Sequence, residues 1–418
     1  MAKKEIVKIG LVGHGPRGEG ILKTFLNIEG VKVVAVCDIK EECLKTAEST
    51  MLETAGYKPL LFTDYDEMLK VEEIDAIINT AAWSVHIEMA CKAMKAGKDV
   101  AIEAGGAYSV RECWKLVETQ QETKRRCMML ENCCYGRTEL ALLKMKREGK
   151  FGEIVHASGG YIHDLRYFLS VLQGVGLERL ENHQKRNCDN YPTHALGPIA
   201  KILDINRGNR MVSLVSMASK GPSLEDYFAN NDKEITKNFN GSKFAQGDHV
   251  TTIIKCANGE TITMEMSQTL PRPYTRNLGL FGTKGGYLGT GNQFYFDDMI
   301  EYKEDGFPVG HNVTDFLGNA DSFIEQNDHP IWEEKVKNGD LSKGGHGGMD
   351  RLVCKAFIES IRDDVETPID VFDCASWMVI STLSEDSIAL GGAPVAIPDF
   401  TNGKWVSRKF VKTNKWSI

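Results

Sequence analysis

Near the start of the chain lies Val7-Lys-Ile-Gly-Leu-Val-Gly-His-Gly-Pro-Arg-Gly18, an apolar run that ends in three glycines spaced as GxGxxG. Apolar residues return at helical spacing directly afterwards, so the stretch predicts a strand, a tight turn and a helix. Gly13 would make the turn, Gly15 would let the backbone approach a pyrophosphate, and Gly18 would let the helix pack closely on the strand. The phosphates of a dinucleotide would then lie at the helix N-terminus.

A second apolar run over residues 31–37 ends in Asp38, twenty residues beyond Gly18. A carboxylate at this position suits the ribose hydroxyls of NAD and would repel the 2′-phosphate of NADP. The alternative is a glycine turn in another kind of α/β domain, with Asp38 capping the next helix. Because the motif, the strand and the acid occur together, the sequence predicts an NAD-binding domain.

The length and composition indicate a globular protein of two domains. A chain of 418 residues exceeds what one hydrophobic core usually organises, and 42% hydrophobic residues are ample for two cores. The net charge of −8 is spread without long blocks of like charge, which argues against the basic footprint of a nucleic-acid-binding protein. We therefore expect no nucleic-acid partner.

Several features of the sequence predict a cytoplasmic protein. The N-terminus passes from two lysines directly into the first strand and leaves no room for a signal-peptide core. No apolar stretch reaches membrane-spanning length, so we expect no membrane partner. The eleven cysteines form no CxxC pair, as expected for free thiols in a reducing compartment. Cys133 and Cys134 beside Cys127 lack the tight spacing of a zinc site, so we expect no bound metal.

Strands and helices alternate through the first part of the chain, as a doubly wound parallel sheet requires. After Asp38 the pattern predicts helices over 41–55, 64–69, 87–96 and 110–124 and strands over 57–62, 74–80, 99–103 and 127–132. The prediction is an α/β fold with a Rossmann NAD-binding domain over residues 1–134. Residues 135–418 would form an α+β domain for substrate binding and oligomerisation, with an open, mostly antiparallel sheet.

The pattern within the second domain is less regular. Strands are expected over 154–160, 211–218, 249–256 and 260–268, and helices over 138–149, 351–362 and 371–390. Residues 174–190 show little periodicity, and we interpret them as a loop on the substrate side.

Polar and aromatic residues gather where ligands bind in such folds. Trp83 and His86 follow the strand over 74–80, at the carboxyl end where open α/β sheets bind ligands. Packing at a helix start is the alternative for both. Tyr191 and His194 are three residues apart in Tyr-Pro-Thr-His, which would place them on one side of a helix that begins there. They suit general acid and base roles because burial and nearby charge can move their pKa values toward neutrality.

A dinucleotide domain followed by an α+β half resembles the glucose-fructose oxidoreductase and inositol dehydrogenase superfamily. Members usually end the fifth strand in Glu-Lys-Pro, whereas this chain has Glu103-Ala104-Gly105 and lacks the catalytic lysine. A more specific similarity is to glycoside hydrolase family 109, the NAD-dependent α-N-acetylgalactosaminidases. The similarity rests on residues 130–135, 160–166, 190–198, 206–208, 270–274 and 346–350, stretches spread over nearly the whole chain.

The resemblance implies a cofactor site and a sugar site. Together with the glycine motif, it implies that NAD is contacted by Gly13, Gly15, Pro16, Arg17, Gly18, Asp38, Trp83, His86, Glu103, Ala104 and Asn132. The sugar site would be lined by Tyr161, His163, Arg179, Tyr191, Pro192, Thr193, His194 and Tyr274. We expect Tyr191 and His194 to be the acid and base. Arg179 would hold a hydroxyl or lower a tyrosine pKa, and Tyr135 is a further catalytic candidate.

Purely structural roles are the alternatives for several of these residues. Tyr191 and Tyr274 could be half-buried packing residues, and His163 with Asp164 could be a hydrogen-bonded pair in a loop. His346 lies among glycines, and we leave it outside the predicted site.

The reaction that the resemblance implies is hydrolysis through transient oxidation. NAD oxidises C3 of the sugar, a base removes the acidified C2 proton, the glycosidic oxygen leaves, and water adds before C3 is reduced again. Such glycosidases are exceptions to the scheme with two carboxylates, and NAD acts as a prosthetic group because the net redox change is zero. The partner would be a small-molecule glycoside. The resemblance also implies a homo-oligomer formed through the sheet of the second domain.

Two other functions are compatible with an NAD-binding chain. One is net dehydrogenation of a sugar or cyclitol with free NAD, and the other is a regulator that binds NAD without catalysis. The missing lysine and the Tyr-Pro-Thr-His stretch favour the glycosidase over the dehydrogenase. An acid/base cluster serves no purpose in binding alone, which favours an enzyme over a regulator, although the fold by itself does not fix the function.

Overall fold

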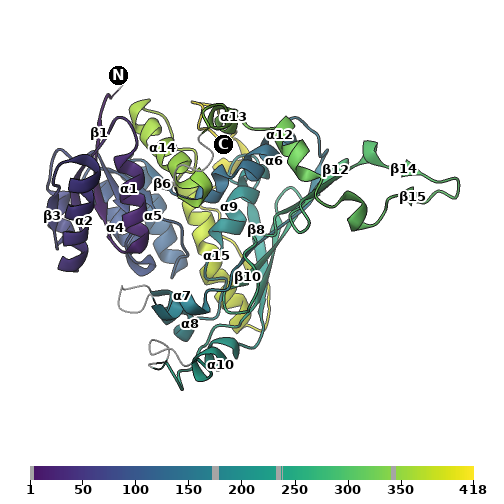
Figure 1. Cartoon of the computed structure of the whole chain (residues 1–418), viewed down its shortest axis with the longest axis horizontal. Helices are drawn as coiled ribbons and strands as arrows, with labels where there is room; N and C mark the ends of the chain where they lie inside the picture. Colours follow the sequence, from purple (N-terminus) through teal and green to yellow (C-terminus); the bar gives the residue numbers. More distant parts are fainter. Residues whose placement is uncertain (1–3, 172–177, 232–236, 238, 340–344) are drawn as a thin grey trace.

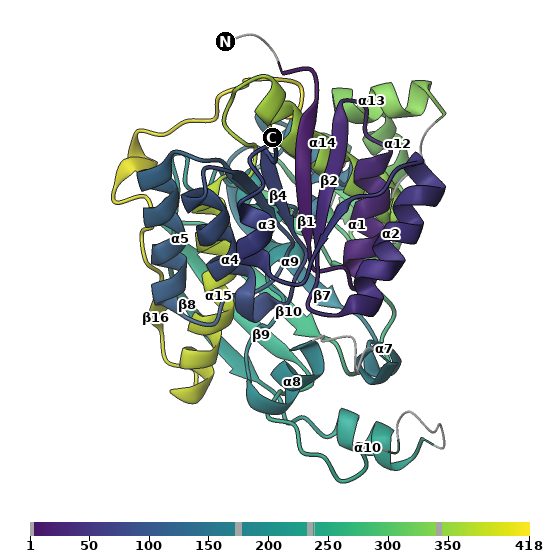
Figure 2. The same ribbon diagram turned by 90° about the vertical axis from the view of Figure 1, so that its left-hand side faces the viewer.

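The computed structural model describes residues 4–171, 178–231, 237, 239–339 and 345–418. Its N-terminal part contains a six-stranded sheet in the order β3-β2-β1-β4-β5-β6, in which every pairing is parallel (Figure 2). The strands are β1 (Val7–Val12), β2 (Val31–Cys37), β3 (Leu60–Phe62), β4 (Ala76–Asn79), β5 (Asp99–Ile102) and β6 (Cys127–Met129). The helices between them are α1 (Pro16–Leu26), α2 (Glu41–Ala55), α3 (Tyr65–Leu69), α4 (Trp83–Lys95) and α5 (Val110–Thr123). The predicted doubly wound sheet is confirmed.

Helices from the end of the chain complete the packing of this first domain. Strands β4 and β5 are buried at every position, as parallel strands are when both faces of the sheet are covered. Helix α14 (Met349–Arg362) contacts α1 and β1, and α15 (Val371–Ala389) contacts α5 and β6. The C-terminal segment therefore returns to the Rossmann sheet after building the second domain.

The second sheet has eight strands in the order β13-β12-β11-β7-β10-β9-β8-β16, and among the described residues its one parallel pairing joins β7 and β10. The strands are β7 (Ile154–Ile162), β8 (Met211–Ala218), β9 (Val250–Cys256), β10 (Thr261–Ser267), β11 (Gly279–Gly282), β12 (Gly285–Leu288), β13 (Gln293–Phe296) and β16 (Val395–Ala396). Strands β14 (Glu301–Tyr302) and β15 (Pro308–Val309) form a separate hairpin that projects from the body of the molecule (Figure 1). The predicted open, mostly antiparallel sheet is confirmed.

Helices cover one face of this second sheet. They include α6 (Arg137–Arg147), α9 (Thr193–Ile202), α12 (Ala320–Gln326) and α13 (Pro330–Lys337), while α7 (Arg166–Val171), α8 (Glu178–Lys185) and α10 (Ser223–Ala229) lie toward one end (Figure 1). Helix α9 packs on β7 and on α15, and α15 in turn contacts β8. Helices α9 and α15 thus form the shared core between the two sheets.

Some elements differ from the sequence-based expectation. Residues 174–190 were expected to be a loop, but α8 occupies 178–185, and residues 172–177 lie outside the described part of the chain. Helix α8 is mostly polar and buries only one large aliphatic side chain, Leu180, so its periodicity is weak. Strands β11 to β13 were not predicted, because each spans only four residues, and β11 and β12 contain two glycines each. In the described part of the chain, no helix has the length and apolar character needed to cross a bilayer.

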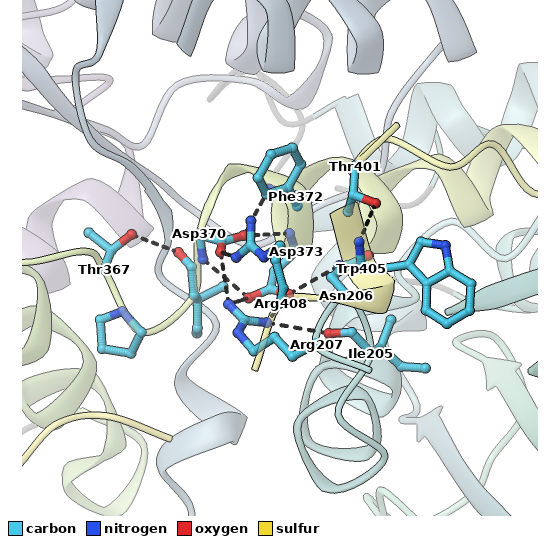
Figure 3. A network of polar contacts seen from close by, with 12 residues as sticks. Ile205, Asn206, Arg207, Thr367, Asp370, Phe372, Asp373, Thr401, Trp405 and Arg408 are labelled. Carbon is cyan, nitrogen blue, oxygen red and sulfur yellow. Dashed lines mark hydrogen bonds and ion pairs between the residues drawn. The ribbon is translucent and has the colours of Figure 1, made fainter. Parts of the chain in front are cut away.

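A buried ion network fastens the central helices to each other (Figure 3). Asp373 in the first turn of α15 accepts from Lys201 of α9 at 2.7 Å and from Arg207 at 2.9 Å. Arg207 also reaches Asp370, the N-cap of α15, at 2.8 Å, and Arg408 near the C-terminus contacts the same carboxylate. Burial opposes the charge on Asp373, but Arg207 and Lys201 hold its pKa well below the usual range.

We predict that Asp373→Asn lowers the free energy of unfolding by about 3 kcal/mol or more, because it leaves buried cations without their partner. The pKa of Asp373 is depressed, so its contribution is present above the ordinary Asp pKa of about 3.9 and is lost as the pH falls below that value. Denaturant unfolding of both proteins at neutral and acidic pH measures the difference, which should shrink below about pH 4. Asp298→Asn, at an exposed position, is the control. If Asp373→Asn lowered the free energy of unfolding at neutral pH no more than the control does, this stabilising role of Asp373 would be contradicted.

Candidate active site

The glycine motif forms a tight turn between β1 and α1. Gly13 has φ +86°, and a Cβ on it would lie 2.5 Å from the backbone of Ala81. A Cβ on Gly18 would lie 2.1 Å from the carbonyl oxygen of Gly13. Gly15 is the extended N-cap of α1 and provides no side-chain cap, so the first N–H groups of the helix are available to an anion. The residues present therefore fit the pyrophosphate of a dinucleotide.

Asp38 lies beside this turn, at the end of β2. Its Oδ2 accepts from the backbone N–H of His14 at 2.6 Å, and its Oδ1 accepts from the N–H of Lys40 at 2.9 Å. These two bonds fix a partly buried carboxylate next to Gly13. This is the position from which an acid can hold the ribose hydroxyls of a dinucleotide.

Arg17 in the first turn of α1 is held by carboxylates from two other segments. Its guanidinium donates to Glu103 at 2.9 Å and to Asp350 at 2.7 and 3.0 Å. Asn132 donates to Asp350 at 2.7 Å, and Nδ1 of His346 lies 2.9 Å from the same carboxylate. Three residues assigned to NAD thus belong to one network, in which Arg17 contacts both Glu103 and Asp350, and Asp350 contacts Asn132.

Asp350 lies in the first turn of α14, and no role for it was predicted from the sequence. Burial would raise its pKa, but hydrogen bonds from His346 and Arg17 hold the pKa well below the usual range. The His-Gly-Gly-Met-Asp stretch, which contributes to the family resemblance, could have pointed to Asp350. However, no spacing rule connects that stretch with Arg17.

Six aromatic side chains lie together next to the residues that fit the dinucleotide. The ring of Trp83 stacks on that of Tyr191 at 5.3 Å, and Tyr161 lies 4.7 Å from Tyr191. Tyr161 also meets the edges of Tyr274, His163 and His194. Tyr161 and Tyr191 are 8% and 5% exposed, whereas Tyr274 is 49% exposed and lies at the rim. The structure therefore brings five predicted sugar-site residues together with Trp83, which was predicted to contact NAD.

The guanidinium of Arg179, on α8, covers this aromatic group. It lies 4.9 Å from the ring of Trp83 and 4.7 Å from that of Tyr191. Burial raises the pKa of Tyr191 well above its usual value, and the nearby Arg179 charge opposes that rise. This placement agrees with the expected influence of Arg179 on a tyrosine.

A chain of three polar side chains runs from the Rossmann sheet to Tyr191. Glu131 follows β6 and is fully buried, and its Oε1 lies 2.7 Å from Nδ1 of His194. On the other side of the imidazole, Nε2 lies 3.4 Å from the hydroxyl of Tyr191. Burial would raise the pKa of Glu131, but the charge and hydrogen bond of His194 lower it. Nδ1 of His194 lies within ion-pair distance of the carboxylate, and the neutral tautomer with its proton on Nδ1 would have its lone pair on Nε2, facing Tyr191.

Glu131 is a site residue that the sequence analysis did not select. The available signal was a carboxylate at the carboxyl end of a parallel strand, where such folds bind ligands. Pro192 and Thr193 are buried at the start of α9, where they set the position of His194. The predicted placement of Tyr191 and His194 on one side of a helix start agrees with the structure.

Two predicted site residues have other positions. Tyr135 was expected among the catalytic groups, but its side chain is fully buried and its hydroxyl donates to the carbonyl of Trp416 at 3.0 Å. This prediction was wrong, because the short 3-10 turn over Asn132–Tyr135 directs the ring into the core. His86 is 1% exposed, and its Nε2 lies 2.8 Å from the carbonyl of Ala81. Its ring supports the turn beside Gly13 instead of offering a side chain to a cofactor.

The remaining predicted residues form the border between the two sites. The carbonyl of Ala104 accepts from the indole N–H of Trp83 at 3.1 Å, and Ala104 itself is buried. His163 lies against Tyr274 at 5.1 Å, whereas Asp164 pairs with Arg166 and not with His163. Trp83 starts α4 directly after the turn that contacts Gly13, so it links the cofactor residues to Tyr191.

Comparison with known proteins agrees with this geometry. Residues 7–131 match the model of the oxidoreductase family with an NAD-binding Rossmann fold, and residues 135–407 match the C-terminal domain of glycosyl hydrolase 109. A glycosyl hydrolase family 109 protein of Solibacter usitatus is 37% identical over 420 residues, which cover 96% of this chain and 90% of the relative. An alpha-N-acetylgalactosaminidase of Tannerella forsythia is 37% identical over 434 residues, with coverage of 97% and 88%.

Solved structures share the fold at low sequence identity. An NAD-binding oxidoreductase from Klebsiella pneumoniae has a TM-score of 0.69 at 14% identity, covering 94% of this chain and 99% of that one. The scyllo-inositol dehydrogenase of Lactobacillus casei with bound NAD(H) and scyllo-inositol has a TM-score of 0.63 at 13% identity, with coverage of 94% and 99%. The family model and this fold identify the N-terminal domain as one that binds a nicotinamide cofactor.

Proposed function

Because the chain belongs to glycosyl hydrolase family 109, we propose that it hydrolyses α-N-acetylgalactosaminides with NAD as a retained prosthetic group. The observation that carries the proposal is the chain from Glu131 through His194 to Tyr191, beside the residues that fit a dinucleotide. A glycosidase that uses two carboxylates would instead need a pair of acids flanking the sugar. The specific choice of NAD over NADP rests on Asp38, whose charge disfavours a 2′-phosphate.

When bound, NAD would supply a reversible oxidation at C3 of the sugar, which makes the C–H bond at C2 acidic. The protein must then remove the C2 proton and deliver a proton to the departing glycosidic oxygen. We assign the first task to the Tyr191–His194 pair, because Nε2 carries a lone pair and Glu131 stabilises the imidazolium that forms. Tyr161, His163 and Tyr274 would position the sugar, and Arg179 would hold Tyr191 and a sugar hydroxyl.

Net dehydrogenation of a sugar or cyclitol is the alternative function. The fold of the inositol dehydrogenases favours it, but fold likeness alone does not decide function. Ala104 stands where the resembling dehydrogenases usually have their catalytic lysine, and the described site offers no lysine in its place. The hydrolase is therefore the function that the site supports best.

Three further proposals concern the domains, the oligomeric state and the location of the protein. We propose that residues 1–134 and 135–418 act as the cofactor and substrate domains. We also propose a homo-oligomer, because apolar side chains are exposed on the outer side of the second sheet and on the projecting hairpin: Val155, Met217, Ile253, Tyr302, Phe307 and Val309 (Figure 1). The eleven cysteines are free, and ten of them are buried, which supports a reducing cytoplasmic location.

The cofactor proposal predicts that the purified protein releases NAD and not NADP when it is denatured. Asp38→Ala should weaken retention of the nucleotide, because the ribose hydroxyls lose their acceptor. Chromatography of the nucleotide released after gel filtration measures both properties. Asp66→Ala, a surface carboxylate in the same domain, should retain as much NAD as the wild type. Release of NADP, or equal retention in both variants, would show that Asp38 does not have this role.

For the acid/base pair, we predict that His194→Ala and Tyr191→Phe each lower turnover of the p-nitrophenyl glycoside about a hundredfold or more while NAD stays bound. Glu131→Gln should lower turnover about tenfold or more, because the imidazolium that forms on His194 loses its carboxylate partner. Tyr302→Phe, an exposed tyrosine, is the control. Near-normal turnover in the His194 and Tyr191 variants would move the acid/base work to other groups.

The mechanism predicts that the hydrogen on one carbon of the sugar exchanges with the solvent. Hydrolysis in heavy water should place deuterium at C2 of the released sugar, because the C2–H bond must break and form again. A pair of carboxylates never breaks that bond, and a net dehydrogenase leaves reduced cofactor behind. NMR of the product and the absorbance of NADH distinguish the three cases. Robust hydrolysis without deuterium at C2 would rule out this mechanism even for a true glycosidase.

A further inference from the structure

Three side chains of different chemistry converge at the base of the proposed site. They are Glu131 after β6, Cys133 in the following 3-10 turn, and His194 in the first turn of α9. One carboxylate oxygen, the thiol sulfur and one imidazole nitrogen all lie within 4.8 Å of one another. Within the described residues, this is the one group of histidine, cysteine and acidic side chains close enough to share a metal ion.

Some polar atoms in and beside this buried group have no well-aligned hydrogen-bond partner. Glu131 is fully buried and Cys133 is 1% exposed, whereas the side chain of His194 retains 12% exposure. The hydroxyl of Thr193 lies close to the carboxylate and helps to lower its pKa, yet neither it nor Oε2 of Glu131 makes a well-aligned hydrogen bond. A buried carboxylate oxygen without an aligned donor is costly and is rare in folded proteins.

We propose that Glu131, Cys133 and His194 bind Zn²⁺ and that the bound ion inhibits the enzyme. Zn²⁺ is bound by carboxylate, thiolate and imidazole at about 2.0–2.3 Å, so three atoms within 4.8 Å can close on it after small side-chain rotations. Three protein ligands leave one position of the tetrahedron open, toward the exposed side of His194. A mixed sulfur, nitrogen and oxygen set favours Zn²⁺ over Mg²⁺ or Ca²⁺, which prefer oxygen ligands.

Charges and protons balance in this binding step. The thiol of Cys133 loses its proton to water, and the thiolate and the Glu131 carboxylate together neutralise the two positive charges of the ion. The Nδ1–H proton of His194 moves to Nε2, so that the Nδ1 lone pair coordinates the metal. One proton is released for each ion bound, and the buried site becomes neutral overall.

The change of tautomer explains why the ion inhibits. In the tautomer that carries its proton on Nδ1, Nε2 of His194 has a lone pair facing the hydroxyl of Tyr191, 3.4 Å away. After Zn²⁺ binds at Nδ1, Nε2 carries the proton and is no longer a base. The ion also removes Glu131 from its contact with the imidazole. The inhibitory effect rests on the proposed function, whereas the metal site itself does not.

The neighbouring Cys134 provides a matched control. It is also a buried thiol, at 3% exposure, but it is not in the group of converging ligands. The sulfur of Cys134 lies near Gly197, one turn after His194 in α9. A Cβ placed on Gly197 would lie 3.0 Å from this sulfur. Cys133→Ser and Cys134→Ser therefore make the same chemical change one residue apart, and only the first removes a proposed ligand.

The experiment titrates the NAD-loaded protein with CoCl₂ as a spectroscopic substitute for Zn²⁺. The wild type and Cys134→Ser should develop a thiolate-to-cobalt charge-transfer band with tetrahedral visible bands, and Cys133→Ser should lack the thiolate band. X-ray absorption of the Zn²⁺-loaded wild type should show one sulfur at about 2.3 Å and lighter donors. This second measurement needs no variant to fold.

In activity assays after treatment with EDTA, all three proteins should turn over within about twofold of one another. ZnCl₂ should then inhibit the wild type and Cys134→Ser, whereas Cys133→Ser should need at least a tenfold higher concentration. Absence of sulfur from the zinc environment, or equal inhibition of Cys133→Ser, would overturn the proposal. If the spectra show the thiolate but no glycosidase activity is found, the metal site stands and the proposed function fails.

Discussion

Glu131 has no access to water, and a buried carboxylate is tolerated only when a donor or a cation faces it. The fold supplies His194, whose Nδ1 lies 2.7 Å away. The two residues come from different parts of the chain, Glu131 from the end of the Rossmann sheet and His194 from the first turn of α9, which packs on β7 of the second sheet. Their contact therefore sets the position of the proposed acid/base pair relative to the residues that fit the dinucleotide. Loss of the contact would leave the buried charge with the backbone N–H of Cys133, at 3.1 Å, as its aligned donor, so the arrangement has little freedom to shift.

The opposite end of α9 is held just as firmly. Lys201 in its last turn bonds to Asp373, the same carboxylate that receives Arg207, so α9 and α15 cannot slide past each other without breaking buried ion pairs. Helix α15 also contacts α5 and β6 of the Rossmann domain. Catalysis by proton transfer requires heavy atoms to approach within hydrogen-bonding reach. The ion pairs at both ends of α9 supply the rigidity that this requirement demands.

The residues that sequence could predict are those whose role depends on local geometry. Gly13, Gly18 and Asp38 belong to one strand–turn–helix–strand unit, and the three-residue spacing of Tyr191 and His194 is a property of one helix start. Glu131 and Asp350 escaped notice because their partners, His194 and Arg17, are distant in the chain, and only the tertiary fold brings them together. Tyr135 was misplaced for the converse reason. Its neighbours in sequence belong to the site, but a single 3-10 turn directs its ring into the core.

The residues that follow β5 pack against the ring of Trp83. The resembling dehydrogenases usually have Glu-Lys-Pro where this chain has Glu103-Ala104-Gly105. A Cβ on Gly105 would lie 2.6 Å from the indole ring of Trp83, so proline cannot occupy that position while the indole is there. The same indole donates to the carbonyl of Ala104 and stacks on Tyr191 at 5.3 Å. The glycine at position 105 therefore leaves room for the indole of Trp83, which contacts both the carbonyl of Ala104 and the ring of Tyr191.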